Sequence, residues 1–403
     1  MTRLTAVARV SRRGAARWTL AMHPWIYRTD LLEPPADEAG AVEVIDNGGR
    51  PIGMGLYSPR STIALRMLTR KLRAIDAPFW KERIAKAVAL REPSSSSADG
   101  TRAPLAPDAT AYRLIHAEAD GLPSLFADRY GPYIVVQLLS AGLEPFRGEI
   151  IDAIRETTRP AGILARHDTA VRALEGLDQD VALLHGEVPE TVEVVESGVR
   201  YLAAPWTGQK TGAFLDQREN RVRAGQLARG HALDCFSFHG SFALHLAKAG
   251  ARVTAVDSSE AALARARENA ALNGLGAIDF VEANVFDFLR DREAEGAHYD
   301  VIVLDPPAFA KRRDAIEAAI RGYKEINLRA LKLLAPGWHL LTFSCSWHIG
   351  RDRFRIMLED AAADSGRLMR WVEWRGQAAC HPEIVQIPES AYLKGVVLQA
   401  VPV

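Results

Sequence analysis

Residues 232–247 have the sequence ALDCFSFHGSFALHLA, and this stretch decides the fold. A short apolar run ends at Asp234, a loop follows to Gly240, and the residues from Phe242 to Ala247 form an amphipathic helical pattern. The order strand, glycine loop, helix is typical of the first unit of an α/β sheet. A side chain at Gly240 would collide with a ligand that approaches the helix N-terminus.

Four further β-type runs follow this stretch and alternate with helical patterns. They cover residues 253–257, 280–282, 299–304 and 339–343. This alternation predicts a mostly parallel, doubly wound sheet, which we place in a domain of residues 191–403. In such sheets, ligands bind beyond the carboxyl ends of the strands.

Polar residues at three of these strand ends indicate a nucleoside site. Asp257 follows Asp234 by 257 − 234 = 23 residues, close to the spacing of about 20 at which an acid reaches ribose hydroxyls. Asn284 can accept a hydrogen bond from an exocyclic amine such as that of adenine. The alternative is that the glycine, the acid and Asn284 serve only turns. The loop lacks GxGxxG, and with Asp305 after the fourth strand the combination favours S-adenosylmethionine over NAD.

Two segments carry the expected chemistry. Asp305-Pro306-Pro307 has fixed backbone angles and carbonyls without competing amide donors, which suits a planar base edge and indicates nucleobase or amide methylation. Cys345, in the segment 342–346, narrows the choice, because a thiolate that adds to C6 of cytosine makes C5 a carbon nucleophile. The alternative for Cys345 is a buried packing residue. The candidate groups for accepting the thiol proton of Cys345 are Asp305, Lys210 and His348.

The three cysteines, Cys235, Cys345 and Cys380, lie far apart and form no CxxC pair. This spacing argues against a zinc site and a disulfide framework, so we expect no metal and a reducing cytoplasm. Cys235 is interpreted as a packing residue, and Cys380-His381 as a turn or part of the lining of the site. Arginines interrupt the N-terminus and no apolar stretch of about 18 residues occurs, so neither a signal peptide nor a membrane span is expected.

Two smaller domains are expected before the α/β domain. Residues 1–72 combine short β-type runs, such as 41–45 and 62–68, with turn signals, which predicts a small β-barrel or sheet module. Residues 73–190, with a strand at 133–138 and helices near 79–90 and 145–157, predict an α+β unit. The polar run near 93–108 predicts a mobile loop. The chain has 50 basic and 50 acidic residues, so any basic surface for RNA must be local.

A polar segment precedes the α/β domain and offers further candidates. Arg218 can neutralise the methionine carboxylate of the cofactor, and Phe214 can stack on a base. The alternative for Arg218 is a solvated position on a helix.

Taken together, the motifs resemble those of the bacterial large-subunit ribosomal RNA cytosine-C5 methyltransferases, in which a PUA-like domain and a central domain precede a class I, Rossmann-like methyltransferase domain. The resemblance spans nearly the whole chain. It rests on the segments 23–27, 55–59, 112–115, 120–123, 210–212, 214–218, 234–236, 305–309, 322–327 and 343–346.

The resemblance implies that Cys345 is the nucleophile, that Asp305 orients the cytosine and that the cofactor is S-adenosylmethionine. The expected cofactor-binding residues are Phe214, Gln217, Arg218, Asp234, Phe236, Gly240, Asp257, Asn284 and Asp305, and the expected substrate-binding residues are Lys210, Pro306 and Phe309. The expected partner is 23S ribosomal RNA, with residues 1–72 as a PUA-like RNA-binding domain and with a homodimer allowed. Two positions depart from the family pattern: some relatives have Asp in place of Asn284, and many have Asp in place of Cys380.

Two other functions fit parts of the pattern. The same fold could methylate a nitrogen, such as N7 of guanine, with Cys345 as a packing residue. A non-catalytic RNA-binding protein could retain the fold as a relic. The combination of the glycine loop, both acids and the thiol in one chain favours the enzyme, because a non-catalytic protein need keep none of them.

Overall fold

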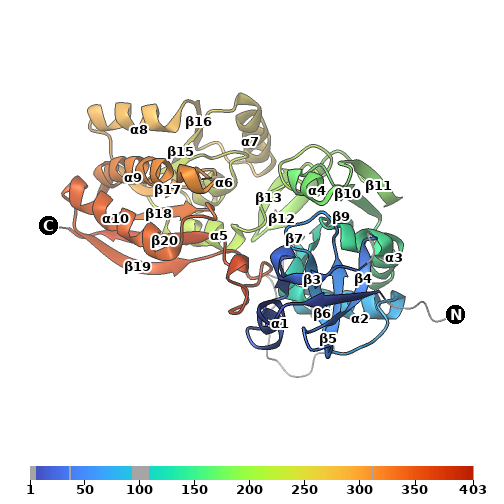
Figure 1. Ribbon diagram of the computed structural model, residues 1–403. Coiled ribbons are helices and arrows are strands. Elements are labelled where there is room, and N and C mark those ends of the chain that lie inside the picture. Colours follow the sequence, from blue (N-terminus) through green and yellow to red (C-terminus); the bar gives the residue numbers. More distant parts are fainter. Residues whose placement is uncertain (1–5, 36–37, 93–108, 311, 403) are drawn as a thin grey trace, which may run out of the picture. The chain divides into compact units, whose positions relative to one another are not determined.

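The computed structural model describes residues 6–35, 38–92, 109–310 and 312–402. By its internal contacts the chain forms two compact units, and the elements of both are labelled in Figure 1. Unit 1 consists of Met1–Val194, Ala203–Leu215 and Cys380–Ser390. Unit 2 consists of Val195–Leu202, Asp216–Ala379 and Ala391–Val403. The run near 93–108, where we expected a mobile loop, lies outside the described residues.

The first sheet of unit 1 has six strands in the order β2-β6-β5-β4-β1-β3. All neighbouring strands are antiparallel except β1 and β4, and their apolar side chains share one core. The elements of this module are β1 (Val7–Val10), α1 (Arg12–Thr19), β2 (Trp25–Ile26), β3 (Leu31–Glu33), β4 (Gly40–Ile45), β5 (Pro51–Tyr57) and β6 (Leu65–Thr69).

The second sheet of unit 1 has five strands in the order β11-β10-β9-β8-β7, with β9 and β10 parallel. Its strands are β7 (Ala111–His116), β8 (Leu125–Tyr130), β9 (Tyr133–Leu138), β10 (Gly162–Arg166) and β11 (Val181–Gly186). The helices of this part of the chain are α2 (Ala77–Arg91), α3 (Arg147–Thr158) and α4 (Ala170–Glu175). β12 (Val192–Glu196) and β13 (Val199–Ala203) form a separate hairpin.

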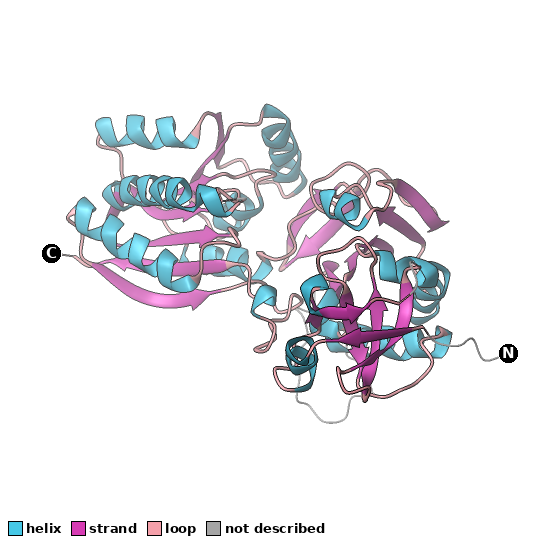
Figure 2. Ribbon diagram, viewed as in Figure 1, coloured by secondary structure: helices cyan, strands magenta, loops and turns pink. Residues whose placement is uncertain are grey.

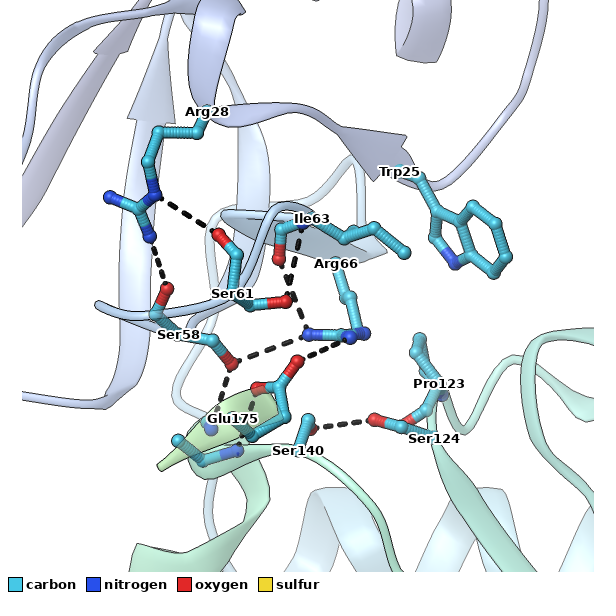
Figure 3. A network of polar contacts seen from close by, with 12 residues as sticks. Trp25, Arg28, Ser58, Ser61, Ile63, Arg66, Pro123, Ser124, Ser140 and Glu175 are labelled. Carbon is cyan, nitrogen blue, oxygen red and sulfur yellow. Dashed lines mark hydrogen bonds and ion pairs between the residues drawn. The ribbon is translucent and has the colours of Figure 1, made fainter. Parts of the chain in front are cut away.

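A buried ion pair joins strand β6 of the first sheet to helix α4 (Figure 3). Arg66 of β6 donates to Glu175 at the end of α4 over 2.8 Å, and both side chains are almost fully buried. Glu175 also accepts from the backbone N–H of Ala141, while Ser58 accepts from Arg66 and from the N–H of Gly142. Burial alone would raise the pKa of Glu175, but the charge of Arg66 and these hydrogen bonds hold it below its ordinary value.

Unit 2 is built on a seven-stranded sheet in the order β16-β15-β14-β17-β18-β20-β19. The first five strands in this order run parallel, and β20 and β19 are antiparallel to their neighbours. The strands are β14 (His231–Cys235), β15 (Arg252–Asp257), β16 (Ile278–Glu282), β17 (Tyr299–Leu304), β18 (Leu334–Ser344), β19 (Met369–Arg375) and β20 (Lys394–Ala400). The central strands β14, β15 and β17 bury both faces, which explains their nearly continuous apolar sequences.

Helices, drawn in cyan in Figure 2, cover both faces of this sheet and pack on it in two separate cores. One core contains apolar residues of α8, α9 and α10, and the other contains residues of α5 and α6. The helices are α5 (Arg218–Leu227), α6 (Ser241–Lys248), α7 (Glu260–Leu272), α8 (Val285–Ala294), α9 (Ile316–Leu333) and α10 (Arg351–Ser365).

The predicted fold class is confirmed: a mostly parallel α/β sheet follows a small β module and an α+β part. The strand predicted at 62–68 begins only at Leu65, because Ser61 accepts a hydrogen bond from the N–H of Ile63 and thereby forms a turn. The domain boundaries at residues 72 and 190 stay predictions. Among the described residues, no helix combines the length and apolar character that crossing a bilayer requires.

Candidate active site

The loop between β14 and α6 passes through three left-handed backbone conformations: Phe236 at φ 63°, Phe238 at φ 50° and Gly240 at φ 77°. Residues other than glycine rarely adopt this conformation, and each instance costs about 1–3 kcal/mol. A Cβ atom at Gly240 would lie 3.0 Å from the Cβ atom of Ala266 in α7. Gly240 is therefore required by its backbone angle and by the packing of α6 on α7, two reasons that the sequence did not reveal.

Two carboxylates hold this loop. Oδ2 of Asp234 accepts hydrogen bonds from the hydroxyl of Ser237 at 2.8 Å and from the N–H of Ala243 at 3.0 Å. Oδ2 of Asp257, at the end of the neighbouring strand, accepts from the N–H of Phe238 at 2.9 Å. The structure thus brings together the two acids that we expected at a nucleoside site, and both order the glycine loop.

Asp234 is buried, and its Oδ1 atom has no hydrogen-bond partner among the described residues. Burial raises the pKa of Asp234 to about 7; its hydrogen bonds to Ser237 and Ala243 oppose the rise, and the charges of Asp305 and Asp257 add to it. A cation bound here would favour the ionised carboxylate. The expected cofactor, S-adenosylmethionine, has a sulfonium and an ammonium group, so these acidic strand ends fit it.

Asn284 is the N-cap of α8. Its side-chain oxygen accepts from the N–H of Phe286 at 2.9 Å, which is the turn role that we considered as the alternative. The oxygen expected to accept from an adenine amine therefore already serves the helix.

A directed chain of hydrogen bonds ends at Asp305, which follows β17. Arg375 Nε donates to Asn220 Oδ1 (2.9 Å), Asn220 Nδ2 donates to Gln217 Oε1 (2.6 Å), and Gln217 Nε2 donates to Asp305 Oδ1 (2.8 Å). An arginine side chain can only donate, so it fixes the orientation of both amides along the chain. Gln217, which we expected at the cofactor, therefore contacts the acid expected to hold the substrate.

Cys345 directly follows β18 and is half-buried. Its Sγ atom lies 3.9 Å from the carbonyl oxygen of Pro306. The prediction that Cys345 lies where a strand leads into a loop is confirmed, and the thiol is brought to the Asp-Pro-Pro segment. His348 lies in the turn that follows Cys345.

The next residue, Ser346, ties this strand end to its surroundings. Its hydroxyl accepts from the N–H of Ala310 at 3.1 Å and lies 2.9 Å from the hydroxyl of Tyr323 in α9. The centres of the Tyr323 and Phe309 rings are 4.6 Å apart, and the Phe309 ring also contacts the ring of Phe236. Phe309, expected at the substrate, is therefore one member of an aromatic cluster.

Lys394 is a residue of this region that the sequence analysis missed. It opens β20, is 3% exposed, and its ammonium group donates to the carbonyl oxygens of Ser346 (2.7 Å) and Tyr392 (2.8 Å). A lysine within an otherwise apolar strand, residues 393–398, was the only local signal for it. Burial lowers the pKa of Lys394 to about 8, and the charge of Cys345 opposes this shift.

Three other expected site residues precede or begin α5. Lys210 and Phe214 belong to unit 1, where the ammonium of Lys210 lies 4.5 Å from the centre of the Phe214 ring. Arg218, the first residue of α5 in unit 2, is buried and forms an ion pair with Glu219. The solvated position that we considered for Arg218 is therefore wrong.

The two remaining cysteines are buried. Cys235 lies in the core of unit 2, and burial raises the pKa of its thiol, as expected for a packing residue. Cys380 belongs to unit 1, and its Sγ atom lies 3.2 Å from Nδ1 of His381. Within the described part of the chain, no three His, Cys, Asp or Glu side chains gather as metal ligands.

Comparison with known proteins agrees with this geometry. A family model described as S-adenosylmethionine-dependent methyltransferase matches residues 135–399, and one described as PUA-like domain matches residues 12–70. Proteins named ribosomal RNA large subunit methyltransferase I are similar over nearly the full length. The protein from Shewanella amazonensis is 41% identical over 93% of this chain and 94% of its own, and that from Klebsiella pneumoniae (strain 342) is 39% identical over 96% of both.

Solved structures share the fold. A candidate S-adenosylmethionine-dependent methyltransferase from Streptococcus mutans has a TM-score of 0.81 at 20% identity and covers 98% of this chain and 100% of its own. A candidate methyltransferase called SMU.776, solved in complex with SAH, has a TM-score of 0.83 at 20% identity with the same coverage. From the family match over residues 135–399 and from its full-length relatives, the chain belongs to the ribosomal RNA large subunit methyltransferase I family of S-adenosylmethionine-dependent enzymes.

Proposed function

We propose that this protein forms 5-methylcytosine in 23S ribosomal RNA through a covalent bond between Cys345 and C6 of the cytosine. The names of its relatives support the large ribosomal subunit RNA as the substrate. The observation that carries the choice of C5 is the half-buried thiol at the end of β18, 3.9 Å from the Pro306 carbonyl. A nitrogen atom with a lone pair attacks a methyl donor without such a nucleophile.

The proposed reaction consists of thiolate addition, methyl transfer and elimination of the thiolate. The thiolate of Cys345 adds to C6, and the electron pair of the C5–C6 double bond makes C5 nucleophilic. C5 then takes the methyl group that bound S-adenosylmethionine would supply: the bond from C5 to the methyl carbon forms, the bond from sulfur to the methyl carbon breaks, and S-adenosylhomocysteine is the leaving group. A base then takes the proton from C5, the double bond forms again, and the thiolate of Cys345 leaves.

Asp305 holds the cytosine in this scheme. Its carboxylate accepts a hydrogen bond from the exocyclic amine at C4, an arrangement that discriminates cytosine from uracil. The base must leave its stack to reach this pocket. Pro306, Phe309 and Lys210 are proposed as further contacts of the RNA. The proposed cofactor-binding residues are Phe214, Gln217, Arg218, Asp234, Phe236, Gly240, Asp257, Asn284 and Asp305.

A trapping experiment tests the covalent step. Ribosomal RNA fragments transcribed with 5-fluorocytidine lack the C5 proton, so the adduct cannot resolve and should survive a denaturing gel. The wild-type enzyme with S-adenosylmethionine should give this adduct, Cys345→Ala should give none, and Cys380→Ala, which removes another thiol, should still give it. An adduct with Cys345→Ala would refute Cys345 as the nucleophile.

Nucleoside analysis tests the product. Labelled S-adenosylmethionine is incubated with the enzyme and RNA from a strain that lacks the gene, and the labelled nucleoside is identified by mass spectrometry. The proposal requires 5-methylcytidine. A product such as 7-methylguanosine would show nitrogen methylation, and tight RNA binding without any methyl transfer would favour a binding protein.

A further inference from the structure

Lys394 contacts the residues on both sides of Cys345. In the antiparallel pairing of β18 with β20, Lys394 lies directly opposite Ser344. Its side chain then reaches past the strand end, where Nζ lies 2.7 Å from the carbonyl oxygen of Ser346. A buried cation thus lies beside the one cysteine that is not fully buried.

Burial of an ammonium group is unfavourable unless hydrogen bonds and an opposite charge compensate it. The carbonyl oxygens of Ser346 and Tyr392 accept two of the three ammonium protons of Lys394. A carbonyl is neutral, so neither contact balances the charge. Arg351 of α10 adds repulsion, and the anionic form of Cys345 attracts the ammonium.

We propose that the ammonium group of Lys394 is the counter-charge of the Cys345 thiolate and holds that thiolate ready for attack. Lys394 is a positioning residue in this role, because it acts through Cys345. The thiol proton passes to solvent while Lys394 keeps its three protons, so the pair carries no net charge. The inference deepens the proposed function, since it concerns the nucleophile of that reaction.

The test measures the thiol without RNA. The rate at which iodoacetamide alkylates Cys345 is followed from pH 5 to pH 10 by mass spectrometry of the peptide that contains it. In the wild type, the midpoint should lie below about pH 8.5, the ordinary value for cysteine. At pH 7, Lys394→Met and Lys394→Gln should each react about tenfold more slowly, which is one pH unit in the midpoint. Lys394→Arg, which keeps the charge, should stay within about threefold of wild type.

The variants separate the charge from the hydrogen bonds. A glutamine can still donate to the carbonyl of Ser346, so a merely structural role predicts wild-type reactivity for Lys394→Gln. Arg351→Gln removes another positive charge from the same surroundings and should change the rate less than about threefold. If it slows alkylation as much as Lys394→Gln does, a general positive potential explains the effect and the proposal is overturned.

Two further results would also overturn the proposal: wild-type and Lys394→Gln profiles that superimpose, or a wild-type midpoint at or above about pH 8.5. The second result needs no variant, so it applies even if Lys394→Met does not fold. The assay is independent of the RNA product. A shifted profile with a product other than 5-methylcytidine would leave this inference standing and refute the proposed function. An unshifted profile with 5-methylcytidine as the product would overturn this inference and support the proposed function.

Discussion

Gln217 donates a hydrogen bond to Asp305, with 2.8 Å between Nε2 and Oδ1. Gln217 is the N-cap position of α5, and Asp305 follows β17, so the contact joins the start of a helix to the end of a central strand. Because Arg375 and Asn220 fix the direction of the donation, the Asp305 carboxylate is oriented before any substrate arrives. Such support is what a reacting group needs in order to keep its geometry.

Replacing Gln217 with Glu should therefore impair catalysis. The new side chain has nearly the same shape but lacks the donor and places a second negative charge beside Asp305. We expect kcat/KM for methyl transfer to fall about 100-fold at pH 7.5, a loss of about 2.7 kcal/mol. Gln226→Glu makes the same change at an exposed position of α5 and should keep nearly full activity. Activity of Gln217→Glu within about twofold of wild type would show that the contact is dispensable.

Cofactor binding should release protons near neutral pH. In the free protein, burial raises the pKa of Asp234 to about 7, so the carboxyl is protonated below that pH. A bound cation favours the ionised form, so affinity should rise with pH up to about 7 and then level off. Calorimetry at pH 6.5 in buffers of different ionisation enthalpy should detect the released proton.

Asp234→Asn should remove this pH dependence and weaken cofactor binding. The asparagine oxygen can still accept from Ser237 and Ala243, so the loop has the hydrogen bonds that it needs. The control is Asp279→Asn, an exposed change in β16, which should leave the proton release intact. Equal proton release by Asp234→Asn and wild type would assign the titration to another group.

Gly240→Ala should destabilise unit 2 more than Gly250→Ala does. Both glycines have a positive φ angle, 77° and 93°, so each alanine has a backbone cost of about 1 kcal/mol. Only the Cβ atom at position 240 meets a close neighbour, Ala266 at 3.0 Å, whereas nothing lies within 4 Å at position 250. Thermal unfolding with and without the cofactor should show the lower midpoint and the weaker cofactor response for Gly240→Ala. Identical behaviour of the two variants would rule out the steric contribution.

Glu175→Gln should destabilise unit 1 by about 3 kcal/mol, because it leaves the buried charge of Arg66 without a partner. The matched control is Glu82→Gln, which breaks ion pairs that are largely exposed and should change stability by less than about 0.5 kcal/mol. Urea unfolding measures both. A cost below about 1 kcal/mol for Glu175→Gln would mean that the pair contributes little to holding α4 on β6.

The strand ends that carry Asp305 and Cys345 could be predicted to meet. Both follow apolar β-type runs, and neighbouring parallel strands expose their carboxyl ends at one edge of the sheet. β17 and β18 are indeed neighbours. The role of Asn284 could not be settled in the same way, because an N-cap and a ligand contact use the same oxygen atom.

The partners of these groups could not be predicted. Lys394 is close to Cys345 only because β20 pairs antiparallel with β18, so that Lys394 lies opposite Ser344, 394 − 344 = 50 positions before it in the chain. The contact of Arg375 with Asn220 is similarly long-range, because these residues are 155 positions apart in the chain. Hydrophobic periodicity is read within a window of about 18 residues, so it cannot predict which distant strands pair.

The amino-acid sequence alone determined the alternation of five strands with helices over residues 232–343, the α/β class of that domain and the candidate nucleophile. These follow from spacing and residue type, which act over a few neighbouring positions. The tertiary structure alone decided which charged groups lie close together: Asp234 near Asp257 and Asp305, Arg66 with Glu175, and Lys394 beside Cys345. Burial and register depend on the packing of segments distant in the chain, and the energy of a charge depends on that environment.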